Sequence, residues 1–190
     1  MTTAIITPPA LEPLTLADAK LHLRIEHADE DDFITQTIAA ARQYVEAVTG
    51  ERMLTQAWRQ YVSDWPSNRG VRLEISPVQS VVAVTAFDRE GVPHQIAPED
   101  TELVRGSRPQ LLMFSASVDP SLAANGLEID LTVGQGDLPT DVSPALRQAV
   151  AMLVAHWYEF RGAVSPSQQP VSLPAGLDAL LRPFKRVGLT

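Results

Sequence analysis

The chain contains no cysteine, which excludes both a disulfide framework and a zinc site built from thiolates. It also has no apolar run approaching the roughly 20 residues that a membrane-spanning helix needs. Its first ten residues carry neither a basic side chain nor a long apolar stretch, so we expect no secretory signal. Together these absences favour a protein made in a reducing cytoplasm, with no membrane partner.

Basic residues are also few, since 15 Lys and Arg stand against 23 Asp and Glu and leave a net charge of −8. A surface of this sign repels phosphates, so we do not expect the chain to grip nucleic acid over a broad area. The charges are uneven, because acidic side chains crowd one early stretch and basic side chains lie near the end. Solvated loops would account for both groups without any function. The acidic group comprises Glu26, Asp29, Glu30, Asp31 and Asp32, and the basic group comprises Arg182, Lys185 and Arg186.

The residue types that carry most enzyme chemistry form no recognisable site. The acidic stretch lacks the alternating ligands and the distal Glu of a calcium loop. Gly134 and Gly136 are followed by Asp-Leu-Pro instead of the helix that a dinucleotide-binding loop requires. No pair of the four histidines has metal-ligand spacing: His22, His27, His94 and His156. We therefore expect no catalytic residue, no metal and no cofactor.

Two segments have the apolar spacing of long amphipathic helices. The first begins near Phe33 and ends at Gly50, and the second runs from Leu146 to Gly162. Apolar residues three and four positions apart form one helix face, which must be buried. We therefore expect the two helices to pack against each other, although roughly a hundred residues separate them. A shorter helix is expected to start at Thr15, where the sequence resembles a capping box.

The stretch between the long helices changes to the period-two alternation of strands. Expected strands cover residues 54–65, 71–75, 78–87, 92–96, 102–105, 110–114 and 127–133, in an antiparallel sheet or a small barrel-like module. The expected fold is α+β. Its helical core comprises residues 1–50, starting with an extended arm, and residues 138–162. An inserted β-rich module spans residues 51–137, and an extended C-terminal tail spans residues 163–190, with a short helix at 175–181.

Aromatic side chains gather on and near the second long helix. Trp157 and Tyr158 continue its apolar face, whereas Phe160 must point elsewhere. Burial inside the fold and contact with a neighbouring subunit both explain such a cluster, since aromatic residues anchor interfaces. The candidates for a subunit interface are Tyr44, Trp157, Tyr158 and Phe160.

Several motifs, in this order along almost the whole chain, resemble the head–tail connector (adaptor) proteins of long-tailed bacteriophages, prophages and gene transfer agents. The longest are LTLADAKLHLRI at residues 14–25, SPVQSV at 76–81, VSPALRQA at 142–149 and AHWYEFR at 155–161. Shorter pieces lie at residues 29–32, 38–42, 49–50, 54–58, 88–91 and 179–185.

This resemblance implies a structural virion protein rather than an enzyme. Members form a ring, commonly of twelve subunits, under the portal protein, and a stopper or tail-terminator protein docks beneath them. DNA passes through such a ring without specific binding, and acidic residues of the early stretch are candidates for its lumen or rim. The resemblance also implies that the C-terminal segment reaches the portal. The candidate docking residues are Leu180, Leu181, Arg182, Phe184, Lys185 and Arg186.

Other functions remain open from the sequence. A stopper or tail-completion protein one layer further down would share the virion location, and contact with portal or tail separates the two. A protein-binding domain without a virion role would be a stable monomer that is indifferent to portal. An enzyme with an unrecognised site is disfavoured, because no nucleophile–base pair or metal cluster can be assembled.

Overall fold

The computed structural model describes residues 2–160, 173–174 and 176–185, and the chain divides into two compact units. The β unit comprises residues 1–10 and 55–134, and the helical unit comprises residues 11–54 and 135–190. The chain therefore passes from one unit to the other three times. Helices and antiparallel sheets are both present, so the α+β class expected from the sequence is confirmed.

The described part of the helical unit contains α1 (Leu16–Leu23), α2 (Asp31–Thr49), the 3-10 turn η3 (Pro139–Asp141), α3 (Pro144–Glu159) and α4 (Leu177–Leu181). Helix α1 begins as its sequence predicts, because the Thr15 hydroxyl accepts a hydrogen bond from the Asp18 amide at 3.1 Å. Helix α2 ends at Thr49 and is capped by Gly50, whose φ of 74° suits a residue without Cβ. Helix α3 ends at Glu159, and the predicted stop at Gly162 lies outside the described residues.

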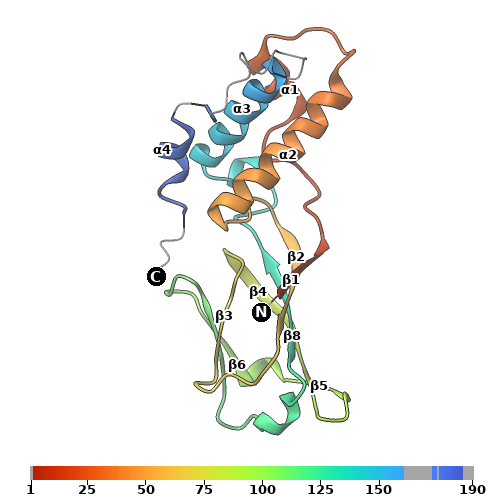
Figure 1. The fold of residues 1–190 in the computed structure, drawn as a ribbon, viewed down its shortest axis with the longest axis vertical. Coiled ribbons are helices and arrows are strands. Elements are labelled where there is room, and N and C mark those ends of the chain that lie inside the picture. The colour runs from red at the N-terminus through yellow and green to blue at the C-terminus, as the bar shows by residue number, and fades with distance from the viewer. Residues whose placement is uncertain (1, 161–172, 175, 186–190) are drawn as a thin grey trace. The chain divides into compact units, whose positions relative to one another are not determined.

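Helices α2 and α3 lie side by side and share one hydrophobic core (Figure 1). Ile38 of α2 and Leu153 of α3 are both almost completely buried in it. Leu177 and Leu181 of α4 belong to the same core. The short helix that the sequence predicted in the C-terminal tail is present as α4, whose apolar residues four positions apart form a face that packs on α2 and α3.

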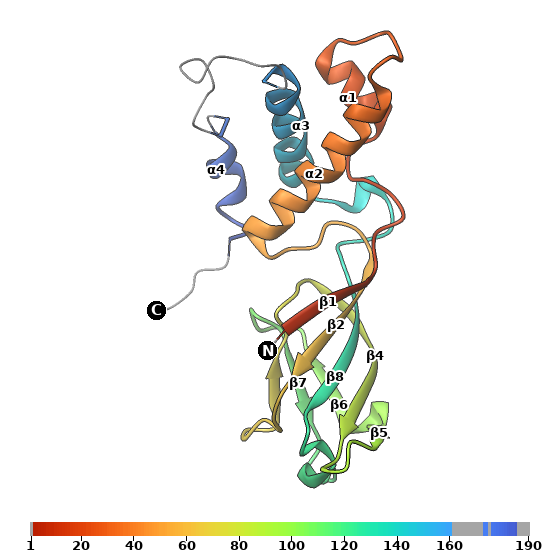
Figure 2. The same cartoon turned by 45° about the vertical axis from the view of Figure 1, so that its right-hand side comes forward.

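The β unit holds two antiparallel sheets (Figure 2). The five-stranded sheet has the order β1-β2-β8-β4-β5, and the three-stranded sheet has the order β3-β7-β6. Their bounds are β1 (Thr2–Thr7), β2 (Gln56–Val62), β3 (Gly70–Arg72), β4 (Val78–Phe87), β5 (Pro93–Gln95), β6 (Thr101–Val104), β7 (Leu111–Phe114) and β8 (Leu127–Val133). Two 3-10 turns complete the unit: η1 (Pro98–Asp100) and η2 (Pro120–Ala123).

A second hydrophobic core holds the two sheets together. Alternate residues of β8 are buried, so one face of this central strand points inward. Leu112 of β7 and Val71 of β3 are fully buried in the same core as Ile129 of β8. The alternation between residues 54 and 133 correctly predicted strands β2 to β8, but it did not predict their division between two sheets.

Strand β1 corrects the expected organisation of the N-terminus. Residues 1–13 were expected to be an arm of the helical core, but Thr2–Thr7 pairs antiparallel with β2 at the edge of the five-stranded sheet. Its sequence, TTAIIT, does not alternate between apolar and polar residues, but five of the six residues are β-branched, which favours a strand. Pro8 and Pro9 then end the pairing, because proline has no amide hydrogen to donate.

Leu153→Ala tests the α2–α3 core. We expect the free energy of unfolding to fall by about 2–5 kcal/mol, because the truncation leaves a cavity among close-packed side chains. Leu21→Ala is the matched control, since Leu21 is also helical but is 79% exposed. Urea denaturation followed by circular dichroism measures both, and equal small losses would show that the two helices do not depend on this contact.

Candidate functional site

The described residues offer several surface groups and one buried ionic cluster as candidate sites. No group of three or more His, Asp or Glu side chains in this part of the chain is placed to hold a metal ion. No helix among residues 2–160, 173–174 and 176–185 is both long and apolar enough to cross a membrane. The candidate sites are therefore the surface residues that the sequence singled out and the residues that fix the chain where it passes between the units.

The acidic stretch contains carboxylates that join helices and carboxylates that are exposed. Glu30 accepts a hydrogen bond from the Tyr158 hydroxyl, which ties the start of α2 to the end of α3. Asp31 forms an ion pair with Lys20 at 2.6 Å and joins α2 to α1. The remaining three are exposed: Glu26, Asp29 and Asp32. Asp29 Oδ2 lies 3.8 Å from His27 Nδ1 on the same connecting segment.

All four aromatic interface candidates contact rings of their own helical unit, and Phe160 lies 5.0 Å from the His156 ring, measured between centroids. Tyr44 meets Trp157 edge-on, with ring centroids 6.0 Å apart. Tyr158 lies 6.3 Å from Phe33, measured between centroids. Phe160 is 37% exposed beyond the end of α3, so it has the most accessible ring of the four candidates.

The candidate docking residues of the C-terminal tail differ in exposure. Leu181 is buried in the helical core, and Phe184 packs against that core. Lys185 donates a hydrogen bond to Asp178 of α4, whereas Arg182 is exposed. Leu180 is half-buried, and Arg186 lies outside the described residues. Arg182 is therefore the described residue of this set with the freest side chain for an acidic partner.

A buried ionic cluster in the helical unit was missed by the sequence reasoning. The Arg42 guanidinium donates to both carboxylate oxygens of Glu12, at 2.7 and 3.2 Å, and to Glu46 at 3.1 Å. Glu46 also accepts from the Met53 amide at 2.9 Å. The one available signal was the i, i+4 spacing of Arg42 and Glu46, which normally indicates an exposed pair.

This cluster keeps Arg42 charged although its side chain is only 7% exposed. Burial lowers the pKa of Arg42, but the hydrogen bond to Glu12 and the charges of Glu46 and Glu12 outweigh that effect and raise the pKa overall. The cluster joins three parts of the helical unit: the segment before α1, helix α2, and the chain that leaves α2. Two of these parts continue into the β unit.

Further hydrogen bonds hold the chain next to residues 54–55 and 134–135, where it changes from one unit to the other. In the helical unit, the Gln135 amide donates to the Met53 carbonyl at 3.0 Å, and its side chain accepts from the Ser143 amide at 2.8 Å. In the β unit, the Gln79 amide group donates to Thr55 at 2.9 Å and to the Gly134 carbonyl at 3.0 Å. Within each unit, these hydrogen bonds therefore link the segment near residues 53–55 to the segment near residues 134–135.

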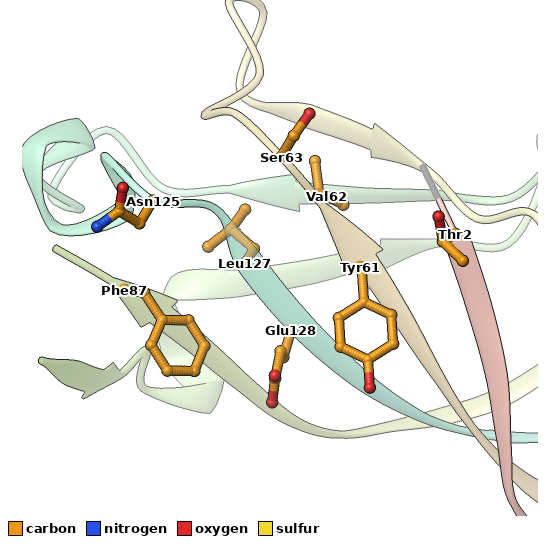
Figure 3. A pocket seen from close by; sticks show the side chains of 8 residues that line it. All are labelled: Thr2, Tyr61, Val62, Ser63, Phe87, Asn125, Leu127 and Glu128. Carbon is orange, nitrogen blue, oxygen red and sulfur yellow. The ribbon is translucent and has the colours of Figure 1, made fainter. Parts of the chain in front are cut away.

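A recess of about 240 Å³ lies where β2 and β4 end and β8 begins, and its lining includes Thr2 of β1. Tyr61 of β2, Glu128 of β8 and Phe87 of β4 project to the same side of the sheet (Figure 3). Thr2 of β1 lines the recess next to Tyr61, its cross-strand partner. Glu128 also forms an ion pair with Arg59 of β2 at 2.8 Å, and Arg59 pairs with Asp130 at 2.6 Å.

Arg42→Met tests the buried cluster. We expect the free energy of unfolding to fall by about 3–5 kcal/mol, because Glu12 and Glu46 both lose the Arg42 guanidinium that compensates their charge. Gln43→Met is the control, since it places the same side chain at the next, exposed position of α2. Urea denaturation at neutral pH measures both variants, and a loss below about 1 kcal/mol for Arg42→Met would show that the cluster contributes little.

Lys185→Met tests the contact that holds the end of α4. The hydrogen bond from Lys185 and its charge lower the pKa of Asp178. A lowered pKa means that the contact stabilises the fold above the ordinary pKa of Asp and is lost as pH falls through the folded value. We expect Lys185→Met to raise the pKa of Asp178 in a carboxyl-carbon NMR titration.

Asp119 serves as an internal control in the same titration, because hydrogen bonds from the amide and hydroxyl of Ser121 lower its pKa independently of Lys185. Its pKa should be equal in the two proteins. An unchanged pKa for Asp178 would mean that Lys185 does not hold it in solution.

Known proteins resemble this chain both in sequence and in fold. Residues 13–91 match the sequence model of the Phage gp6-like head-tail connector protein family. Among curated proteins, none matches. A chain in the neck of an empty gene transfer agent particle, computed with C6 symmetry, is 24% identical with a TM-score of 0.83; the match covers 100% of this chain and 98% of that chain.

Two further structures agree. A chain in the virion of a native gene transfer agent particle is 25% identical with a TM-score of 0.83. A chain in the neck of a native particle, computed with C12 symmetry, is 24% identical with a TM-score of 0.75. Both matches cover 100% of this chain and 98% of the other. The resemblance to head–tail connectors that the motifs indicated is therefore confirmed, in sequence over residues 13–91 and in fold over the full length.

Proposed function

We propose that this chain is a structural virion protein that forms a ring at the head–tail junction of a phage or gene transfer agent particle. The observation that carries the proposal is the fold match over 100% of the chain, at a TM-score of 0.83, to a protein in a particle neck. The connector-family match over residues 13–91 supports it independently from sequence. Its work is mechanical, and no catalytic step is needed.

The ring lies under the portal protein and above a stopper or tail-terminator protein. Arg182, exposed after α4, and Phe184 are the described residues best placed to meet the portal. Exposed Phe160 is a candidate for contact between copies. A ring of twelve copies is consistent with the twelvefold symmetry used for a similar neck protein.

The acidity of the subunit suits a passage for DNA. At a net charge of −8, a subunit repels phosphate over most of its surface, so the genome can pass without being held. We place the exposed carboxylates of Glu26, Asp29 and Asp32 at the lumen or its rim. Glu30 and Asp31 instead stabilise the helical unit through Tyr158 and Lys20.

The test is to co-express the chain with the portal protein of the same particle and to examine the purified complex by electron microscopy. We expect a ring of this chain bound to the portal, with Glu26, Asp29 and Asp32 facing the channel. Arg182→Glu should weaken portal binding at least tenfold, because it reverses the charge of the exposed docking residue. Arg89→Glu is the matched control, since Arg89 is an exposed arginine of the β unit.

Other results would change the assignment. Binding to a tail protein but not to portal would indicate a stopper or tail-completion protein. A stable monomer that ignores both would indicate a protein-binding domain without a virion role. A ring with all three carboxylates on its outer surface would remove them from the DNA path while leaving the ring intact.

A further inference from the structure

Strand β1 is an edge strand without the features that normally protect such an edge. It pairs with β2 on one side, and no other strand of the described chain pairs with it. Its six residues, Thr2–Thr7, include no charged side chain and no proline. Ile5 and Ile6 are 47% and 54% exposed. An uncharged edge with exposed apolar side chains readily pairs with another chain.

The opposite edge of the same sheet is protected. Strand β5 has only three residues and begins with Pro93, which has no amide hydrogen to donate. The turn before it carries Asp88, Arg89 and Glu90, and charges at an edge discourage pairing. The contrast within one sheet indicates that β1 is left open for a partner.

Charge favours a second copy of this chain as that partner. Two copies with a net charge of −8 repel each other, so contact between them is least opposed where both surfaces lack carboxylates. Strand β1 is such a surface, and the carboxylate that lines the recess, Glu128, is paired with Arg59 at 2.8 Å. Burial of Ile5 and Ile6 between copies would add an apolar contribution to association.

The recess beside β1 adds a place for a side chain. Thr2 belongs to both the strand and the wall of the recess, and Tyr61 and Phe87 supply aromatic surface. Proteins that bind an extended segment at a sheet edge obtain affinity from main-chain hydrogen bonds and specificity from adjacent pockets. The edge and the recess together have this arrangement.

We propose that β1 and the adjoining recess form the contact between neighbouring copies in the ring, with an extended segment of the next copy added along β1. This inference rests on the proposed ring function. A closed ring requires that a surface of one copy meet a different surface of the next. Strand β1 therefore meets a segment other than the β1 of its neighbour.

The main test is a double variant, Ile5→Lys with Ile6→Lys, in the full chain. Both side chains are exposed, so the fold should be retained, as circular dichroism will show. Assembly into rings, followed by mass photometry over a concentration series with and without portal, should require at least a tenfold higher concentration. The matched control is Val82→Lys with Val92→Lys, which also adds two charges at apolar residues that are 64% and 49% exposed.

Each outcome decides the matter. Loss of assembly in the β1 variant alone supports the inference. Normal assembly of that variant, or equal loss in both, overturns it and leaves the ring function standing. If the wild-type chain forms no ring alone or on portal, the proposed function itself fails, and this is seen without any variant.

The absence of cysteine allows a second test. Ile6→Cys introduces a single thiol, whose reaction with a maleimide should slow at least tenfold when the ring assembles. Val82→Cys is the control and should react equally in free and assembled protein. Unchanged reactivity at Ile6→Cys overturns the inference, and so does an oxidised dimer cross-linked between two β1 strands, since such a pair is two-fold and cannot continue around a ring.

Discussion

A buried positive charge must be neutralised where it lies, and in this chain the residues that neutralise Arg42 come from different segments. Glu12 precedes α1, Glu46 lies one turn further along α2, and the Met53 amide shares Glu46 as its acceptor. Removing any partner would leave a charge in a site with little access to water. The cluster therefore sets the geometry of the segments that enter and leave the helical unit, and the rest of that unit packs around this fixed point.

Each unit combines such a polar anchor with its own apolar core. The helical core is built from the facing sides of α2 and α3 and is closed by α4. The β core is built between a five-stranded and a three-stranded sheet. Gln135 on one side and Gln79 on the other hold adjacent segments of the passing chain through side-chain amides. This division lets the helical unit and the β unit present separate surfaces, with acidic and basic groups on the first and an uncharged edge on the second.

The elements that the sequence predicted well are those governed by local periodicity. The apolar spacing of α2 and α3, the Thr15 cap and the Gly50 stop all depend on residues within a few positions, and each is present in the structure. Strand β1 was missed because its partner, β2, lies over fifty residues away in sequence and nearby prolines suggested an arm. The Arg42 cluster was missed for a related reason, since Glu12 lies thirty positions earlier. Among the candidate site residues, Asp29 is exposed whereas Asp31 is half-buried and paired with Lys20, and no sequence pattern distinguishes two carboxylates that lie two positions apart.

The threefold passage of the chain has a mechanical consequence. Most inserted modules are held by two covalent connections, but here β1 supplies a third, since residues 1–10 lie in the β unit and residue 11 begins the helical unit. A single backbone cut at any one passage leaves the two units tethered by the remaining two. Two of the three connecting segments join the units covalently at both ends, whereas the third transmits force to the β unit only through the pairing of β1 with β2, so the hydrogen bonds of that strand pair become part of the connection.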